Sequence, residues 1–176
     1  QNTLFLGANG WYNWTAHSWT SREQQKAFWK RDMGDAHCIN FEAGEEPDSL
    51  ASSHADMLRE AVAYAQTDDS VDEIVITTHT IPHRSGMVPD NHQWGYLNGS
   101  FHNPLMEQVW MVDEKKKIKF WGFGHTHFHY DFVDWDIRFV NNSRGYSQER
   151  RNERFGGIMQ IDTSEELVSA FETEIE

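Results

Sequence analysis

Two apolar runs of the sequence lead directly into histidine. Ile74–Thr78 is followed by His79, and Ile118–Phe123 is followed closely by His125 and His127. Short runs rich in β-branched and aromatic residues predict strands, the first of them buried on both faces. Because ligands in open α/β sheets bind at the carboxyl ends of the strands, we expect these three imidazoles to converge at one edge of a sheet. Three histidines near one point predict a metal site.

Each of these histidines also has a purely structural interpretation. A single histidine after a strand is commonly a surface or hydrogen-bonded residue, and a chain with ten histidines forms accidental clusters. Two acidic sequences, Asp35-Ala36-His37 and Asp90-Asn91-His92, have the composition of metal ligands but lie away from the predicted strand ends. We interpret the first as unrelated to the site. A mononuclear site that borrows Asp35 or Asp90 stays open as an alternative, and it requires their loops to fold back to the strand ends.

The elements that must position the histidines are predicted from periodicity and from capping and turn residues. A capping-box spacing from Thr20 to Glu23 begins the first helix, and helical spacing of apolar residues marks the second. Residues 80–103 show no sustained periodicity and are predicted to form a long loop. Loops of this length are usually functional or disordered. Along the chain, the predicted elements are a strand near 3–7, helices at 21–33 and 49–66, a strand at 74–78, a helix at 104–113, a strand at 118–123, a hairpin of 130–133 and 137–140, and a last strand at 157–161. The acidic tail that follows, 165–176, is predicted to be either helix or strand. This order is typical of an α/β domain with a β-rich end.

Composition restricts the classes of function. The chain has 176 residues, one domain's worth, and a net charge of −13, which argues against a surface for duplex nucleic acid. No apolar run approaches the roughly 18–20 residues that span a bilayer, so we expect no membrane association and a cytoplasmic protein. A single cysteine, Cys38, excludes an intrachain disulfide, and metal ligands must then be histidine and carboxylate. We expect the tryptophans to pack in the core and loops, and Trp94 to line a pocket.

The motifs together resemble the C-terminal half of a calcineurin-like metallophosphoesterase. The resemblance rests on Gly124-His125-Thr126-His127 after a Trp/Phe-rich strand, on Thr77-Thr78-His79-Thr80-Ile81-Pro82 before it and on Asn142-Ser143-Arg144-Gly145-Tyr146 after it. Leu4 to Trp11 also resembles a mid-domain strand and loop of that family, so the likeness runs to about Tyr146. It implies an α/β fold, the four-layer α/β/β/α sandwich with mixed sheets. Residues 1–176 are then the C-terminal portion of a single such domain, with its N-terminal portion absent.

The resemblance also implies an activity and a ligand set. It implies hydrolysis of phosphomonoesters or phosphodiesters at two divalent metal ions, which are Mn, Fe, Zn or Ni. His79 and His125 would bind one ion and His127 the other. The family's catalytic histidine and bridging aspartate have no counterpart in this chain, so a separate chain or segment would supply them; nucleic acid enters only as a possible substrate. The alternative is a degenerate binding module of the same fold.

Two further residues are predicted to bind the substrate. Arg144 lies in the loop after His127, where its guanidinium is able to make bidentate contact with a phosphate. His83 follows His79 in the long loop. For Arg144, a salt bridge to one of the many carboxylates is the structural alternative.

Overall fold

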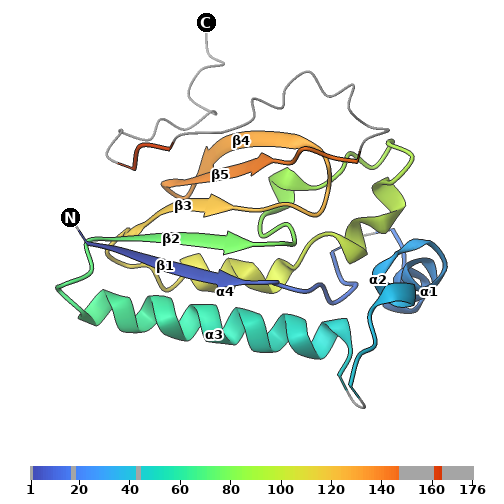
Figure 1. The fold of residues 1–176 in the computed structure, drawn as a ribbon, viewed down its shortest axis with the longest axis horizontal. Helices are drawn as coiled ribbons and strands as arrows, with labels where there is room; N and C mark the ends of the chain where they lie inside the picture. The colour runs from blue at the N-terminus through green and yellow to red at the C-terminus, as the bar shows by residue number, and fades with distance from the viewer. Residues whose placement is uncertain (1, 17–18, 43–44, 147–160, 164–176) are drawn as a thin grey trace, which may run out of the picture.

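One mixed sheet forms the centre of the molecule in the computed structural model, which describes residues 2–16, 19–42, 45–146 and 161–163. Its strands lie in the order β1-β2-β3-β5-β4, with β4 antiparallel to β5 and the other neighbours parallel. The strands are β1 (Thr3–Ala8), β2 (Glu73–Thr78), β3 (Ile118–Gly122), β4 (His129–Asp134) and β5 (Ile137–Asn142). Because β1, β2, β3 and β5 are parallel, their carboxyl ends meet at the same edge (Figure 1).

The long helix α3 (Pro47–Thr67) covers the β1 side of the sheet (Figure 1). Its buried residues fall at helical spacing and include Ala51, Ala55, Leu58, Val62 and Ala65. The last four of these residues pack with β2 and β3 side chains in the main core. Pro47 stands in the first turn, where its missing N–H costs no hydrogen bond.

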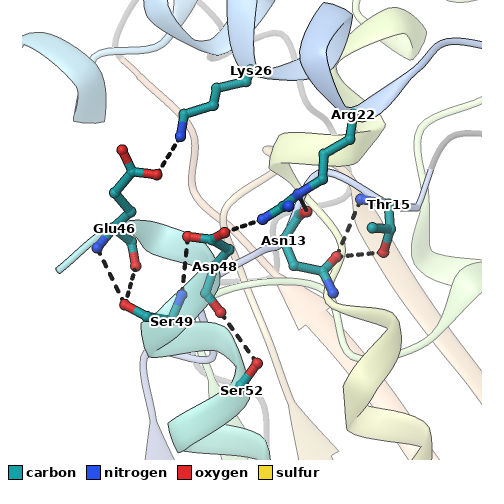
Figure 2. A network of polar contacts seen from close by, with 8 residues as sticks. All are labelled: Asn13, Thr15, Arg22, Lys26, Glu46, Asp48, Ser49 and Ser52. Atoms are coloured by element: carbon teal, nitrogen blue, oxygen red, sulfur yellow. Dashed lines mark hydrogen bonds and ion pairs between the residues drawn. The ribbon is translucent and has the colours of Figure 1, made fainter. Parts of the chain in front are cut away.

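Two helices lie beyond the carboxyl ends of the parallel strands, α1 (Arg22–Asp32) and α2 (Asp35–Cys38) (Figure 1). Ser21 and Gln24 form the capping box of α1, so the cap lies one residue later than predicted. Polar contacts attach α1 to the start of α3: Arg22 pairs with Asp48, and Lys26 pairs with Glu46 (Figure 2). Trp29 of α1 packs with Tyr12 and Trp14 in a second, aromatic cluster, and Ala36 of α2 packs against it.

Several predictions differ from the structure in detail. The helix expected at 104–113 is a 3₁₀ turn, η3 (Pro104–Met106), followed by one short helix, α4 (Glu107–Trp110). The long loop contains two 3₁₀ helices, η1 (Arg84–Gly86) and η2 (Gly95–Ser100). Trp19 and Trp135, which we expect to pack in the core or in loops, lie outside the core and are 76% and 54% exposed. The strand predicted at 157–161 and the acidic tail lie outside the described residues, apart from Ile161.

None of the helices within the described ranges combines the length and the apolar composition that crossing a membrane requires.

Candidate functional site

The turn after β2 places His79 beside the end of β1. The backbone N–H groups of His79 and Thr80 both donate to the Asn9 carbonyl, at 3.0 and 3.1 Å. Thr78 Oγ1 donates to the Thr80 carbonyl at 2.8 Å and accepts from Trp121 Nε1 at 3.0 Å. These bonds turn the chain sharply at the end of the strand, so His79 and the exposed Asn9 lie next to each other at the sheet edge.

The turn after β3 holds His125 in a strained backbone conformation. The φ angle of His125 is 68°, in the left-handed region that β-carbon-bearing residues rarely adopt. The Thr126 N–H donates to the Gly124 carbonyl across it at 2.9 Å, which closes a three-residue turn. Buried Asn141 stabilises this turn, because its Nδ2 donates to the Thr126 carbonyl at 2.9 Å. Strain of this kind persists where the surroundings fix it, and it is common at functional sites.

His79 and His125 form a pair of imidazoles. His79 Nε2 and His125 Nδ1 are 2.9 Å apart, and His125 Nε2 lies 2.9 Å from the Ser100 carbonyl. Since a carbonyl only accepts, Nε2 of His125 carries the proton and Nδ1 presents its lone pair towards His79. The same arrangement, one ring nitrogen on a backbone carbonyl and the other free to ligate, is usual for metal-binding histidine.

Aromatic packing and burial keep this pair neutral. Tyr12 stacks on the His125 ring at 6.0 Å between centroids, and Phe101 contacts its edge at 5.3 Å. Burial, with a contribution from His79, lowers the pKa of His125 to about 4, and burial also lowers the pKa of His79. The neutral form is the one that binds metals.

All three predicted metal ligands line one pocket of about 540 Å³. His127 lines it together with Tyr146, whose ring contacts the imidazole edge-on at 4.5 Å. The long loop contributes Val88, His92, Gln93, Trp94, Leu97 and Phe101 to the lining. The sequence therefore correctly predicted that Trp94 lines a pocket.

Asp35 lines the same pocket, although the sequence pattern around it was interpreted as unrelated to the site. The Tyr12 hydroxyl donates to Asp35 Oδ2 at 2.8 Å and accepts from Trp29 Nε1 at 2.5 Å. The Asp35 carboxylate partly offsets the effect of burial on the pKa of both His79 and His125. The fold thus returns Asp35 to the strand ends, whereas Asp90 is not among the lining residues.

The two residues predicted to bind substrate lie outside the lining of this pocket. His83 is buried, 4% exposed, and its Nε2 lies 3.2 Å from Asp134 Oδ2. Its ring packs against Trp110, Phe132 and Phe139. Arg144 is exposed, two residues before Tyr146.

Two side chains of the pocket have the chemistry of metal ligands. His79 and His125 are neutral nitrogen donors that face each other, and the Ser100 carbonyl fixes the ring of one of them. Within the described ranges, no group of three or more His, Cys, Asp or Glu side chains is arranged to hold a metal ion.

Comparison with known proteins supports the fold. The structure resembles that of the phosphopantetheinyl hydrolase of Mycobacterium tuberculosis, with a TM-score of 0.61 and 15% sequence identity over 82% of this chain and 50% of that one. This likeness confirms the predicted calcineurin-like α/β fold. In sequence, an uncharacterised protein of Acanthamoeba polyphaga mimivirus is 30% identical in an alignment of 109 positions that covers 58% of this chain and 36% of that protein. No protein-family model matches the sequence.

Proposed function

We propose that this chain is part of a metal-dependent phosphoester hydrolase, either a phosphomonoesterase or a phosphodiesterase. The observation that carries the proposal is the neutral His79–His125 pair at the carboxyl edge of the sheet, in a pocket that His127 also lines. The fold adds support, because the solved structure that it resembles is a hydrolase by name.

His79, His125 and His127 would hold two divalent ions, Mn, Fe, Zn or Ni, with further ligands from elsewhere. When bound, such ions neutralise charge on the phosphate oxygens and activate water for attack. The protein's own contribution begins with the Ser100 carbonyl, which keeps the proton on His125 Nε2. Tyr12 and Phe101 then exclude water from the buried side of the ring.

The remaining ligands would come from another segment or from a separate chain. The chain spans half the length of the hydrolase and about a third of the viral protein that it matches. In the described part of the molecule, β1 pairs on one side only, with β2, and Phe5 on this strand is 73% exposed. An apolar side chain on an edge strand is a suitable surface for such a segment.

The test compares metal content and hydrolysis in the complete protein that carries this sequence. Elemental mass spectrometry of the purified protein should find about two ions per molecule. His125→Ala should weaken metal binding about 10–100-fold and lower phosphate release from p-nitrophenyl phosphate and bis(p-nitrophenyl) phosphate together. His37→Ala, which changes an exposed histidine outside the pocket, is the control and should behave as wild type.

Either of two results would reject this function. Metal content and hydrolysis that survive His125→Ala would mean that the imidazole pair is not the site. A complete protein that has neither metal nor hydrolytic activity would instead be a binding module of the same fold.

A further inference from the structure

The described lining of the pocket contains negatively charged side chains. Two carboxylates, Asp32 and Asp35, are among the described lining residues, and none of those residues is lysine or arginine. A phosphate that enters such a pocket meets repulsion from any carboxylate that is not neutralised.

Asp32 is neutralised within the fold. Arg31 forms two bonds with it, from Nε to Oδ1 at 2.8 Å and from the guanidinium NH2 to Oδ2 at 2.7 Å. The Tyr96 hydroxyl adds a third, at 2.9 Å to Oδ2. The Arg31 guanidinium therefore neutralises the charge of the Asp32 carboxylate at the rim of the pocket.

Asp35 has no such cation. Its hydrogen bond comes from Tyr12, a buried hydroxyl whose pKa is raised by burial and, further, by Asp35 itself. A neutral donor orients a carboxylate without cancelling its charge. No lysine or arginine in the described ranges forms an ion pair with Asp35. The Asp35 carboxylate, which Tyr12 holds in one orientation, therefore contributes an uncompensated negative charge to the pocket.

Aromatic rings lie in the same lining. Trp94 is 46% exposed, and Phe128 and Tyr146 line the pocket with it. Aromatic faces attract ammonium groups, and quaternary ammonium ligands in particular are recognised by such rings. A carboxylate together with aromatic rings forms a suitable environment for an organic cation, and the histidines proposed for the phosphate line the same pocket.

We propose that Asp35 is a specificity-determining residue, which selects phosphoesters whose alcohol carries an ammonium group. The proposal rests on the proposed function for the position of the phosphate. The ammonium would lie between Asp35 and the aromatic lining. The positive charge of the ligand then compensates the carboxylate that would otherwise repel the phosphate.

The test uses two ligands of the same shape and different charge. Phosphocholine carries a trimethylammonium group, and 3,3-dimethylbutyl phosphate replaces it with a neutral tert-butyl group. Isothermal titration calorimetry on the complete, metal-loaded protein, with the phosphonate analogues of both ligands to prevent turnover, should show the trimethylammonium ligand binding about tenfold more tightly. Asp35→Asn should remove this preference, and Asp32→Asn, the matched control on the same rim, should keep it.

The source of the ammonium ester is tested in a separate arm, with phosphatidylcholine vesicles in place of free phosphocholine. A preference for either form over its neutral counterpart, lost in Asp35→Asn, supports the proposal and identifies the source. Equal affinity for the two isosteric ligands, or an equal loss of both in Asp35→Asn, would overturn it. Because binding is the readout, a protein that shows the preference without hydrolysis would reject the proposed function and retain this inference.

Discussion

At the residue scale, Tyr12 connects three groups of the candidate site. Its ring stacks on His125, its hydroxyl donates to Asp35, and the same oxygen accepts from Trp29. Tyr12 and Trp29 are both buried, so no water replaces the hydroxyl as the acceptor for the Trp29 N–H when the hydroxyl is removed. Tyr12 is therefore a positioning residue for both the imidazole pair and the carboxylate.

We predict that Tyr12→Phe lowers the free energy of unfolding by about 1–3 kcal/mol, because the Trp29 N–H loses its acceptor in the interior. Urea denaturation followed by circular dichroism measures this change. Tyr64→Phe, at a side chain that is 71% exposed, is the control and should be nearly neutral. Equal effects of the two substitutions would contradict the role assigned to the Tyr12 hydroxyl.

His102 makes stability depend on pH at a position outside the pocket lining. Burial lowers its pKa from 6.5 to about 4, so the unfolded chain binds this proton more readily than the folded one. Stability is then complete above about pH 6.5 and falls by up to about 3 kcal/mol as the pH decreases towards 4. In His102→Gln this acid loss should be smaller, as measured by unfolding midpoints across that range. A pH profile identical to that of wild type would show that other groups cause the acid loss.

At the element scale, η2 and α1 approach so closely that one position requires glycine for space. A β-carbon on Gly99 would lie 2.7 Å from Cδ of Gln25, a fully buried side chain. Gln25 cannot easily move, because its Nε2 donates to the Tyr96 carbonyl at 2.9 Å and to Thr20 Oγ1 at 2.5 Å. This contact sets the distance between α1 and the loop that lines the pocket.

We therefore expect Gly99→Ala to destabilise the protein by about 1–3 kcal/mol through overpacking. The matched control is Gly34→Ala, because a β-carbon there meets no heavy atom within 4 Å. Thermal unfolding of both variants makes the comparison. If Gly34→Ala proved as damaging as Gly99→Ala, intrinsic glycine effects rather than the Gln25 contact would be responsible.

The sequence predicted the elements whose signal is local. The strand expected at 74–78 is β2 (Glu73–Thr78), and the hairpin expected at 130–133 and 137–140 is β4 with β5, because apolar runs and turn residues identify them directly. The helix expected at 104–113 is mostly absent. Pro104 stands in the first turn as predicted, but this turn is a 3₁₀ turn that is followed by only four α-helical residues.

From the sequence, only those site residues that closely follow a predicted strand could be identified. His79, His125 and His127 follow strands, so topology alone brings them into one pocket. Asp35 and Ser100 reach the site through the packing of α1, α2 and η2, and nothing in their local sequence indicates which way those elements fold back. Asn141 likewise gains its role from the turn that it stabilises, 15 or more residues away along the chain.

At the scale of the whole molecule, charge repulsion opposes the folded state. The net charge of −13 comes from 28 acidic and 15 basic residues, with histidine neutral. Ion pairs such as Arg22–Asp48 relieve this repulsion locally (Figure 2), but both side chains are partly exposed and contribute little. Long-range repulsion should therefore dominate the response to salt.

We predict that raising NaCl from about 10 to about 100 mM increases Tm by about 2–4 °C, because the Debye length falls from about 30 to about 10 Å. Differential scanning calorimetry in a weakly binding buffer measures the shift, and an equal osmolality of glucose controls for non-ionic effects. A lower Tm in salt would mean that surface ion pairs outweigh the net repulsion.

The hydrogen bond from Trp29 to Tyr12 gives the candidate site an intrinsic optical signal. Trp29 Nε1 contacts the oxygen of a ring that is stacked on His125, so a change of charge at the imidazole alters the electric field at a buried indole. The emission of Trp29 should consequently shift when a cation or a proton reaches His125. The chain contains eight tryptophans, and subtracting the spectrum of Trp29→Phe from that of wild type isolates this one. The protein therefore needs no attached dye for occupancy of the site to be followed in real time.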